Sequence, residues 1–231
     1  MLTAAALCPA APLLARELTG ADPVVPELRQ ACREAVDALV QASPDVVVVV
    51  GVGDQTRIWD AATAQLDLTP YAPALGTPPA AQAETLPLAL GLGGRLLDEA
   101  GYHGPRELQE VGADEPAPDC VALGAVLAQV APRTALLVMA DGSARRSRKA
   151  PGYLDERSAA FDAEVGRAIR DGDMPTLLAL DARLARELMA TGRPAWQVLA
   201  AAASGRRPAS LVRYDDDPFG VAYLIASLTV G

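Results

Sequence analysis

A run of five valines restricts the folds open to this chain more than any other feature of its sequence. Val46 to Val50 follow Pro44 and Asp45, and the run ends at Gly51. Consecutive β-branched side chains favour extended backbone, and a strand without polar alternation is apolar on both faces. Because both faces must be covered, the run predicts a central parallel strand with helices above and below it.

Two other apolar segments predict buried strands, and a helical pattern lies between the first of them and the valines. These strand segments are 2–7 and 134–140. Over residues 26–42, apolar side chains recur every three or four positions, as they do on one face of a helix. Strand, helix and strand in this order form a βαβ unit, which makes the two strands parallel.

Caps, chain breakers and apolar spacing indicate the remaining elements. Asp119, Asp155, Asp173 and Asp181 are expected to cap helices, and Gly192 is expected to end the helix that Asp181 opens. The longer helices are predicted at 86–100, 119–130, 155–170 and 195–203, and two further strands at 211–214 and 221–228. Segments 55–83 and 102–118 are expected to be irregular, with one short helix near 59–65.

Length and composition favour one folded unit. The chain has 231 residues, of which 51% are hydrophobic and 21% charged, and it shows no internal repeat or linker. We therefore expect residues 1–231 to form a single α/β domain, a three-layer α/β/α sandwich around a mixed, mainly parallel sheet. No segment reaches the roughly 18 apolar residues of a membrane span. The apolar start lacks the basic region of a signal peptide, so a soluble, cytoplasmic protein without a membrane partner is expected.

Charge and histidine content exclude several classes of function. The chain has 29 acidic and 20 basic residues, a net charge of −9, which argues against a nucleic-acid partner. His103 is the only histidine, so sites that need two histidines are excluded, including the two-histidine iron site and the HExxH zinc site. Cys8, Cys32 and Cys120 have no CxxC spacing and are expected to be reduced and mostly buried.

Ligands of open α/β sheets bind beyond the carboxyl ends of the parallel strands, so three loops are candidates for a site. They span residues 8–12, 51–57 and 141–149. Asp54 and Asp141 each follow a predicted strand, where a carboxylate acts as a general base or merely caps a turn. We expect the two to lie close together at one end of the sheet. The glycines of the second loop lack the third member of a dinucleotide fingerprint, and no cofactor is expected.

The third loop is unusually basic for an acidic chain. Its positive residues are Arg145, Arg146, Arg148 and Lys149. A guanidinium group can bind a carboxylate or a phosphate through two parallel hydrogen bonds. The loop therefore predicts a small anionic ligand or an acidic partner, and the alternative is a solvated surface loop. Ser143 lies beside Asp141, but no histidine is near in sequence to activate it as a nucleophile.

Motifs spread over nearly the whole chain add a family resemblance to these loops. They are CPAAP at 8–12, PDVVVVV at 44–50, MADGSAR at 139–145, KAPGYLD at 149–155, GRPAWQVL at 192–199 and YDDDPFGVAY at 214–223. Together they resemble the LigB-like superfamily of class III extradiol ring-cleavage dioxygenases, which includes the Memo-type proteins. The last three motifs resemble a branch of uncharacterised bacterial members. The resemblance implies an α/β/α sandwich around a mixed sheet.

The same resemblance implies a ferrous iron held by two histidines and a glutamate in the ring-cleaving members. The positions that match the two histidines hold Ala10 and Gln55, and the position of a third, acid–base histidine holds Ala144. No motif places the glutamate. An iron site with open coordination positions needs these ligands, so the sequence predicts no bound metal and no ring cleavage.

These observations lead to one expected function and two alternatives. We expect a metal-free member of the superfamily that binds a small anionic or polar ligand in the ancestral cleft. The residues expected to contact it are Ala10, Gln55, Ser143, Arg145 and Arg146. The first alternative is a non-redox enzyme with Asp54 or Asp141 as general base and the two arginines holding an anionic substrate. The second is an interaction module that pairs with itself or with another protein.

Overall fold

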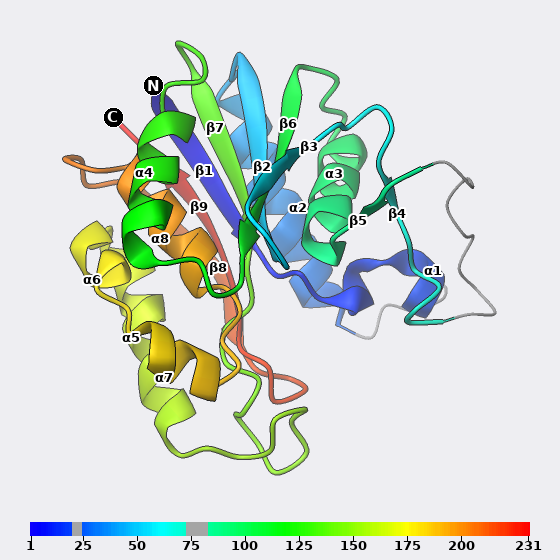
Figure 1. Cartoon of the computed structure of the whole chain (residues 1–231), viewed down its shortest axis with the longest axis vertical. Helices are drawn as coiled ribbons and strands as arrows, with labels where there is room; N and C mark the ends of the chain where they lie inside the picture. Colours follow the sequence, from blue (N-terminus) through cyan, green and yellow to red (C-terminus); the bar gives the residue numbers. More distant parts are fainter. Residues whose placement is uncertain (20–24, 73–82) are drawn as a thin grey trace.

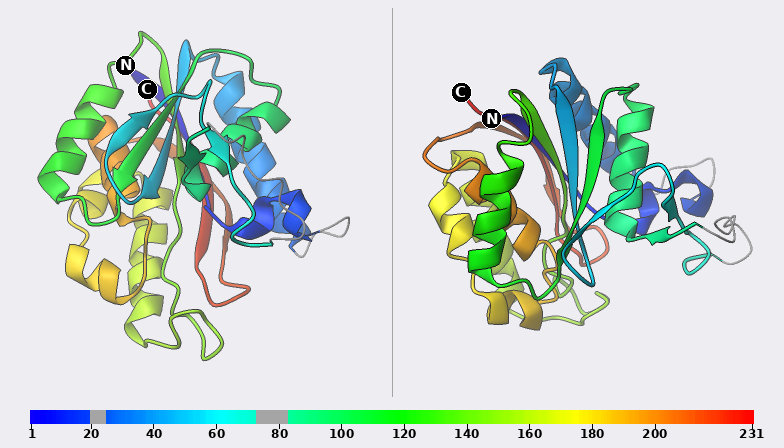
Figure 2. Two further views of the ribbon diagram at one scale, coloured as in Figure 1. Left: turned by 45° about the vertical axis from the view of Figure 1, so that its right-hand side comes forward. Right: turned by 45° about the horizontal axis from the view of Figure 1, so that its top comes forward.

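The computed structural model describes residues 1–19, 25–72 and 83–231, which form a mixed sheet between two layers of helices (Figures 1 and 2). The sheet has seven strands in the order β3-β6-β2-β7-β1-β9-β8. The strands are β1 Leu2–Cys8, β2 Val46–Gly53, β3 Arg57–Trp59, β6 Arg106–Gly112, β7 Thr134–Met139, β8 Ala209–Asp216 and β9 Tyr223–Thr229. The four central strands, β6, β2, β7 and β1, run parallel, and β3, β9 and β8 pair antiparallel with their neighbours. A second, two-stranded sheet joins β4 Gln65–Leu66 to β5 Thr85–Leu86.

Helices cover both faces of this sheet. One face carries α2 Pro26–Gln41 and α3 Leu88–Glu99, preceded by the short helices η1 Pro12–Leu14 and α1 Arg16–Thr19. The other carries α4 Ala117–Leu127, α5 Arg157–Asp171, α6 Met174–Leu178, α7 Ala182–Glu187 and α8 Arg193–Ala202. This arrangement confirms the predicted α/β sandwich with a mainly parallel centre. No helix in the described residues is long and apolar enough to cross a membrane.

The valine run occupies the position that its composition predicts. In β2, Val47 and Val49 face the layer of α2 and α3, whereas Val48 and Val50 face the layer of α8. All four side chains are fully buried. The backbone of β2 pairs with β6 on one side and with β7 on the other, so the polar groups of this buried strand are satisfied by its neighbours.

Two expectations about irregular segments were wrong. Residues 102–118 contain β6, a central parallel strand, and residues 59–65 contain no helix, because Arg57–Trp59 forms the edge strand β3 beside β6. Polar and apolar residues do not alternate regularly along β6, because Gln109 and Glu110 are polar and nevertheless buried. Without β6 there is no partner for β3, so both strands were missed together. Residues 73–82 of the segment expected to be irregular lie outside the described residues.

The helix caps were predicted in part. Asp173 and Asp181 accept hydrogen bonds from backbone N–H groups of the helices that they open, as expected. By contrast, α4 begins two residues before Asp119, after a proline, and this aspartate lies inside the first turn. Gly192 precedes α8 and does not end α7. Asp155 precedes α5 and accepts a hydrogen bond from the N–H of Arg157, its first residue.

The close packing of α4 on α8 gives a test of the fold. A Cβ added at Gly124 would lie 2.3 Å from the carbonyl oxygen of Val198 and 2.7 Å from the Cβ of Ala201. Gly124→Ala is therefore expected to lower the free energy of unfolding by about 2 kcal/mol, although alanine favours helix. Gly94→Ala in α3, where nothing lies within 4 Å, is expected to raise it by about 0.5 to 1 kcal/mol. Urea unfolding measures both, and equal effects of the two variants would contradict the packing described.

Candidate functional site

A cleft of about 620 Å³ lies beyond the carboxyl ends of the parallel strands, where the topology predicts a ligand site. Its walls come from the loops that follow β1, β2 and β6, from the edge strand β3, from the last residue of β7, and from the segment that leads into α3. The lining includes Ala10, Asp54, Gln55, Arg57, Trp59, Tyr71, Leu86, Glu110, Ala113 and Met139. Two of the residues expected from the family resemblance, Ala10 and Gln55, are among them.

Glu110 lies in the wall of the cleft on the β6 side. This carboxylate is 2% exposed and accepts hydrogen bonds through both oxygens. The Trp59 Nε1–H donates to Oε2 at 2.8 Å, and the Gln55 N–H donates to Oε1 at 3.1 Å. The missing side chain of Gly53 makes room for it, because a Cβ there would lie 2.1 Å from Oε1. Glu110 therefore ties the loop after β2 to β3 and shapes the wall of the cleft.

Arg57 is the only positively charged residue among the described residues that line the cleft. Its guanidinium stacks 3.4 Å from the centre of the Trp59 ring, and Nε lies 3.6 Å from Glu110 Oε2. Nη1 donates to Glu84 Oε1 at 3.4 Å. The Nε atom is buried and makes no hydrogen bond within the described structure. Sequence reasoning missed Glu110, Arg57 and Trp59, because only the pairing of β3 with β6 brings them together.

The two candidate aspartates follow adjacent parallel strands, β2 and β7, at the same end of the sheet. Asp54 is exposed and lines the cleft. Asp141 lies behind the loop after β1, where its Oδ1 accepts a hydrogen bond of 3.0 Å from the N–H of Ala10. Desolvation raises the pKa of the Asp141 carboxyl to about 6, and the Ala10 N–H opposes part of this rise. A direct role for both aspartates in one site stays a prediction.

Ser143 and Arg146 belong to a polar network beside the cleft. Ser143 is fully buried, its N–H donates to Asp162 Oδ1 at 2.9 Å, and its hydroxyl donates to Oδ2 of the same carboxylate. Arg146 Nε donates to Asp217 Oδ2 at 2.7 Å and lies 3.8 Å from Asp162 Oδ2. Desolvation raises the pKa of the Asp162 carboxyl. These contacts tie the loop after β7 to α5 and to the β8–β9 turn.

Arg145 is likewise placed next to a carboxylate. Its Nη1 lies 4.0 Å from Asp155 Oδ2, and its carbonyl oxygen accepts hydrogen bonds from the Asp155 N–H and the Ser158 hydroxyl. Neither Arg145 nor Arg146 lines the cleft. Two carboxylates lie beside the Arg146 guanidinium, which favours a structural role for this residue. The Arg145 guanidinium has one distant carboxylate, which Arg157 also binds, and its buried Nε makes no hydrogen bond within the described structure. Ligand binding by them stays a prediction.

The residues present do not fit an iron centre. The positions that the resemblance matches to histidines offer two methyl groups, at Ala10 and Ala144, and one amide, at Gln55. In the described part of the chain, no group of three or more histidine, cysteine, aspartate or glutamate side chains is arranged to hold a metal ion. His103 is exposed and precedes β6, so it lies at the end of this strand remote from the cleft.

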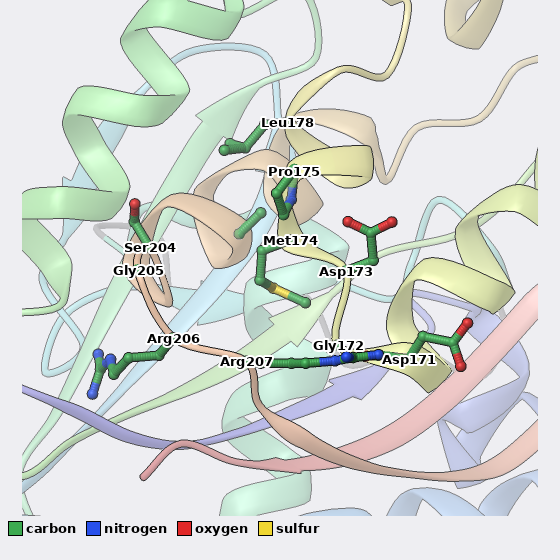
Figure 3. Close-up of a pocket in the computed structure, with 11 residues that line it drawn as sticks. Asp171, Gly172, Asp173, Met174, Pro175, Leu178, Ser204, Gly205, Arg206 and Arg207 are labelled. Carbon is green, nitrogen blue, oxygen red and sulfur yellow. The ribbon is translucent and has the colours of Figure 1, made fainter.

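A second cavity, of about 590 Å³, opens between α6 and the turn after α8 (Figure 3). Figure 3 shows Met174 between Asp173 and the pair Arg206 and Arg207 at the edge of this cavity. Arg206 Nη1 donates to the carbonyl oxygen of Leu2, the first residue of β1, so the cavity lies at the amino ends of the parallel strands. Open sheets bind ligands at the opposite end, which favours the cleft as the functional site.

Comparisons with known proteins support the fold and do not assign a family. No protein-family model matches the chain, and no curated protein matches its sequence. The structure is similar to the crystal structure of the uncharacterized protein JW3007 from Escherichia coli K12, with a TM-score of 0.58 and 12% sequence identity. The match covers 98% of this chain and 99% of that one. At this identity, the similarity establishes a shared fold.

The buried carboxylate of Glu110 gives a first prediction for the site. Glu110→Ala removes the carboxylate that accepts the Trp59 Nε1–H and lies beside Arg57. The buried indole N–H would lose its hydrogen-bond acceptor, and the guanidinium would lose a neighbouring negative charge. The free energy of unfolding is expected to fall by about 3 kcal/mol, measured by urea denaturation. The control is Asp54→Ala, an exposed carboxylate of the same cleft, with an expected change below about 0.5 kcal/mol. A loss below about 1 kcal/mol for Glu110→Ala would contradict its role as the anchor of the wall.

The raised pKa of Asp141 gives a pH-dependent prediction. The Asp141 carboxyl has a pKa of about 4 in the unfolded chain and about 6 in the folded protein, so folding disfavours its ionised form. Its ionisation therefore lowers the free energy of unfolding as the pH rises from about 4 through about 6. Asp141→Asn keeps an oxygen for the Ala10 N–H and removes the charge. The variant is expected to be more stable than the wild type by on the order of 2 kcal/mol at pH 8, and equally stable at pH 4. Thermal unfolding across this range measures the difference, with Asp54→Asn as the control that changes neither end.

Proposed function

We propose that this chain is a metal-free relative of the class III extradiol dioxygenase superfamily that binds a small polar or anionic ligand in the cleft. The observation that carries the proposal is the position of the cleft. It lies beyond the carboxyl ends of the parallel strands, and its lining includes Ala10 and Gln55, which the resemblance matches to metal-binding histidines. The sequence motifs and the α/β/α fold support the same assignment.

Ring cleavage is not part of this proposal. The chemistry of the superfamily needs an iron with open coordination positions, and a methyl group at Ala10 supplies no ligand. The superfamily cleft would therefore be kept as a binding site after its metal ligands were lost.

The lining supports a ligand with a polar end and an apolar, planar part. Asp54 and Gln55 supply polar groups at the mouth, and the Arg57 guanidinium supplies a positive charge. Tyr71, Leu86 and Met139 supply apolar surface. Pockets for small molecules typically combine a mostly apolar wall with a few fixed polar groups. In this proposal, Arg57 provides the anion contact that the sequence suggested for Arg145 and Arg146.

The proposal is tested by thermal unfolding in the presence of sodium benzoate and of sodium phosphate, with ionic strength matched by chloride. At about 100 times the dissociation constant, a ligand raises the free energy of unfolding by about 2.7 kcal/mol. Ala113→Phe, which fills the cleft from an exposed lining position, is expected to abolish this response. The matched control is Ala159→Phe on the exposed side of α5, which should respond as the wild type does.

Two outcomes would overturn the proposal. Loss of the response in the Arg145→Ala, Arg146→Ala double variant, with Ala113→Phe still responding, would place the ligand at the basic loop. An equal response in every variant would assign the effect to ordinary salt stabilisation.

A second candidate function is supported by the pKa of Asp141. A carboxylate with a pKa of about 6 is suited to accept a proton near neutral pH, but Asp141 lies behind the loop after β1, whereas the exposed Asp54 lines the cleft. A non-redox enzyme at this cleft would therefore use Asp54 as general base, or Asp141 if the loop after β1 gives the ligand access to it. For a compound that the cleft binds and converts, the rate is expected to be lost in Asp54→Asn in the first case. In the second case it is expected to rise with a pKa near 6 and to be lost in Asp141→Asn, with binding retained. Unchanged turnover in both Asp141→Asn and Asp54→Asn would exclude this candidate.

A further inference from the structure

The buried guanidinium of Arg193 has only neutral oxygens around it. The residue is 2% exposed, and no described aspartate or glutamate forms an ion pair with it. Nη1 donates to the carbonyl oxygen of Glu115 at 2.7 Å and to Gln197 Oε1 at 2.9 Å, and Nη2 donates to the carbonyl oxygen of Ala113 at 3.2 Å. A guanidinium stays charged inside proteins, so these bonds satisfy its donors but leave one positive charge without a counter-charge.

Neighbouring side chains hold this guanidinium in one position. Arg193 is the first residue of α8, and Gln197 follows one turn later on the same side of the helix. Gln197 is also buried, and its amide nitrogen donates to two backbone carbonyl oxygens. Glu115 offers Arg193 its carbonyl oxygen, whereas its carboxylate accepts a hydrogen bond from the Thr56 hydroxyl. The charge is therefore fixed in place and is not neutralised there.

This charge lies directly behind the wall of the cleft. Ala113 lines the cleft, and its carbonyl oxygen accepts the hydrogen bond from Nη2. Thr191, two residues before Arg193, lines the cleft as well. Arg193 is not itself a lining residue, so it acts on a ligand through the wall and not by contact. Inside a protein the low dielectric lets a charge act over several ångströms, and salt screens it less than an exposed charge.

The other charges at the cleft do not take over this role. Arg57 lies between two carboxylates, with Glu110 Oε2 at 3.6 Å from Nε and Glu84 Oε1 at 3.4 Å from Nη1. Asp54 is exposed, where water and salt weaken its field. A neutral ligand would leave the charge of Arg193 uncompensated, whereas an anionic ligand would supply the missing counter-charge.

We propose that Arg193 is a specificity-determining residue of the cleft, whose buried charge favours a small monocarboxylate over a neutral ligand of the same shape. This role rests on the function proposed for the cleft and narrows its ligand class. A monocarboxylate fits because one positive charge lacks a partner. Arg57 contacts the ligand, and Arg193 acts on it from behind Ala113.

Isothermal titration calorimetry with benzoate and with benzamide tests the proposal, because the two probes have nearly the same shape and differ by one charge. The wild type is expected to bind benzoate more tightly than benzamide. Arg193→Gln removes the charge and keeps a hydrogen-bond donor. It is expected to weaken benzoate about tenfold and to change benzamide by less than about twofold. Arg193→Lys keeps the charge and is expected to keep the preference for benzoate.

Arg206→Gln is the matched control. Arg206 is another partly buried arginine whose guanidinium donates to backbone carbonyl oxygens, those of Leu2 and Ala202, but it lies at the opposite ends of the parallel strands. Arg206→Gln changes the net charge of the protein by the same amount as Arg193→Gln. It should bind both probes as the wild type does.

A second variant neutralises the charge without removing the guanidinium. Gln197→Glu places a carboxylate beside Nη1 of Arg193, and the guanidinium favours the ionised form of this carboxylate. It is expected to weaken benzoate and to leave benzamide unchanged. Circular dichroism checks that each variant is folded, and Gln197→Glu carries the test if Arg193→Gln does not fold.

The outcomes separate this proposal from the function proposed for the cleft. Equal weakening of both probes in Arg193→Gln would overturn the proposal, because the residue would then have a purely structural role. Unchanged benzoate affinity in folded Arg193→Gln or Gln197→Glu, with binding lost in Ala113→Phe, would also overturn it and would leave the proposed function intact. A wild type that binds neither probe would overturn the proposed function, and the role of Arg193 with it.

Discussion

Covering both faces of β2 is the constraint on which the rest of the structure depends. Four consecutive fully buried valines leave no face for solvent, so α3 must lie on one side of the strand and α8 on the other. The backbone of β2 must be paired on both edges, which places β6 and β7 beside it. At the end of the strand, Gly51 lets α3 approach, because a Cβ there would lie 2.8 Å from Ala89 Cβ. The cleft forms where this packing ends.

A buried carboxylate then gives the cleft its shape. Burying Glu110 is costly unless its oxygens are hydrogen bonded, and here the partners are Trp59 from β3 and Gln55 from the loop after β2. The same carboxylate lies beside the guanidinium of Arg57, which stacks on the tryptophan ring. These contacts hold the polar groups of the wall in place, and such preorganisation would lower the entropic cost of binding the proposed ligand.

The polar loop after β7 and the apolar face of α4 serve different needs. In the loop, Ser143 donates hydrogen bonds to Asp162 of α5, and Arg146 lies beside Asp162 and donates to Asp217 after β8. These contacts join the loop to α5 and to the β8–β9 turn. In α4, the side that faces α8 completes the core, and the outer side has no partner within the described chain. The first arrangement accounts for Arg146, one of the four basic residues of this loop. The second leaves exposed apolar side chains on the outside of α4, among them Val121 and Val126.

The sequence by itself determined the α/β class, the central parallel strand and the end of the sheet at which a site would lie. Apolar runs and helical periodicity are local signals, and the valine run permits only a strand covered on both faces. The lack of histidine at the positions of Ala10 and Gln55 was likewise readable. Only the tertiary structure decided that 106–112 is a strand, and that Glu110, Arg57 and Trp59 build the cleft wall. A buried polar side chain is stable only when distant segments supply its partners, and no local pattern encodes which segments these are.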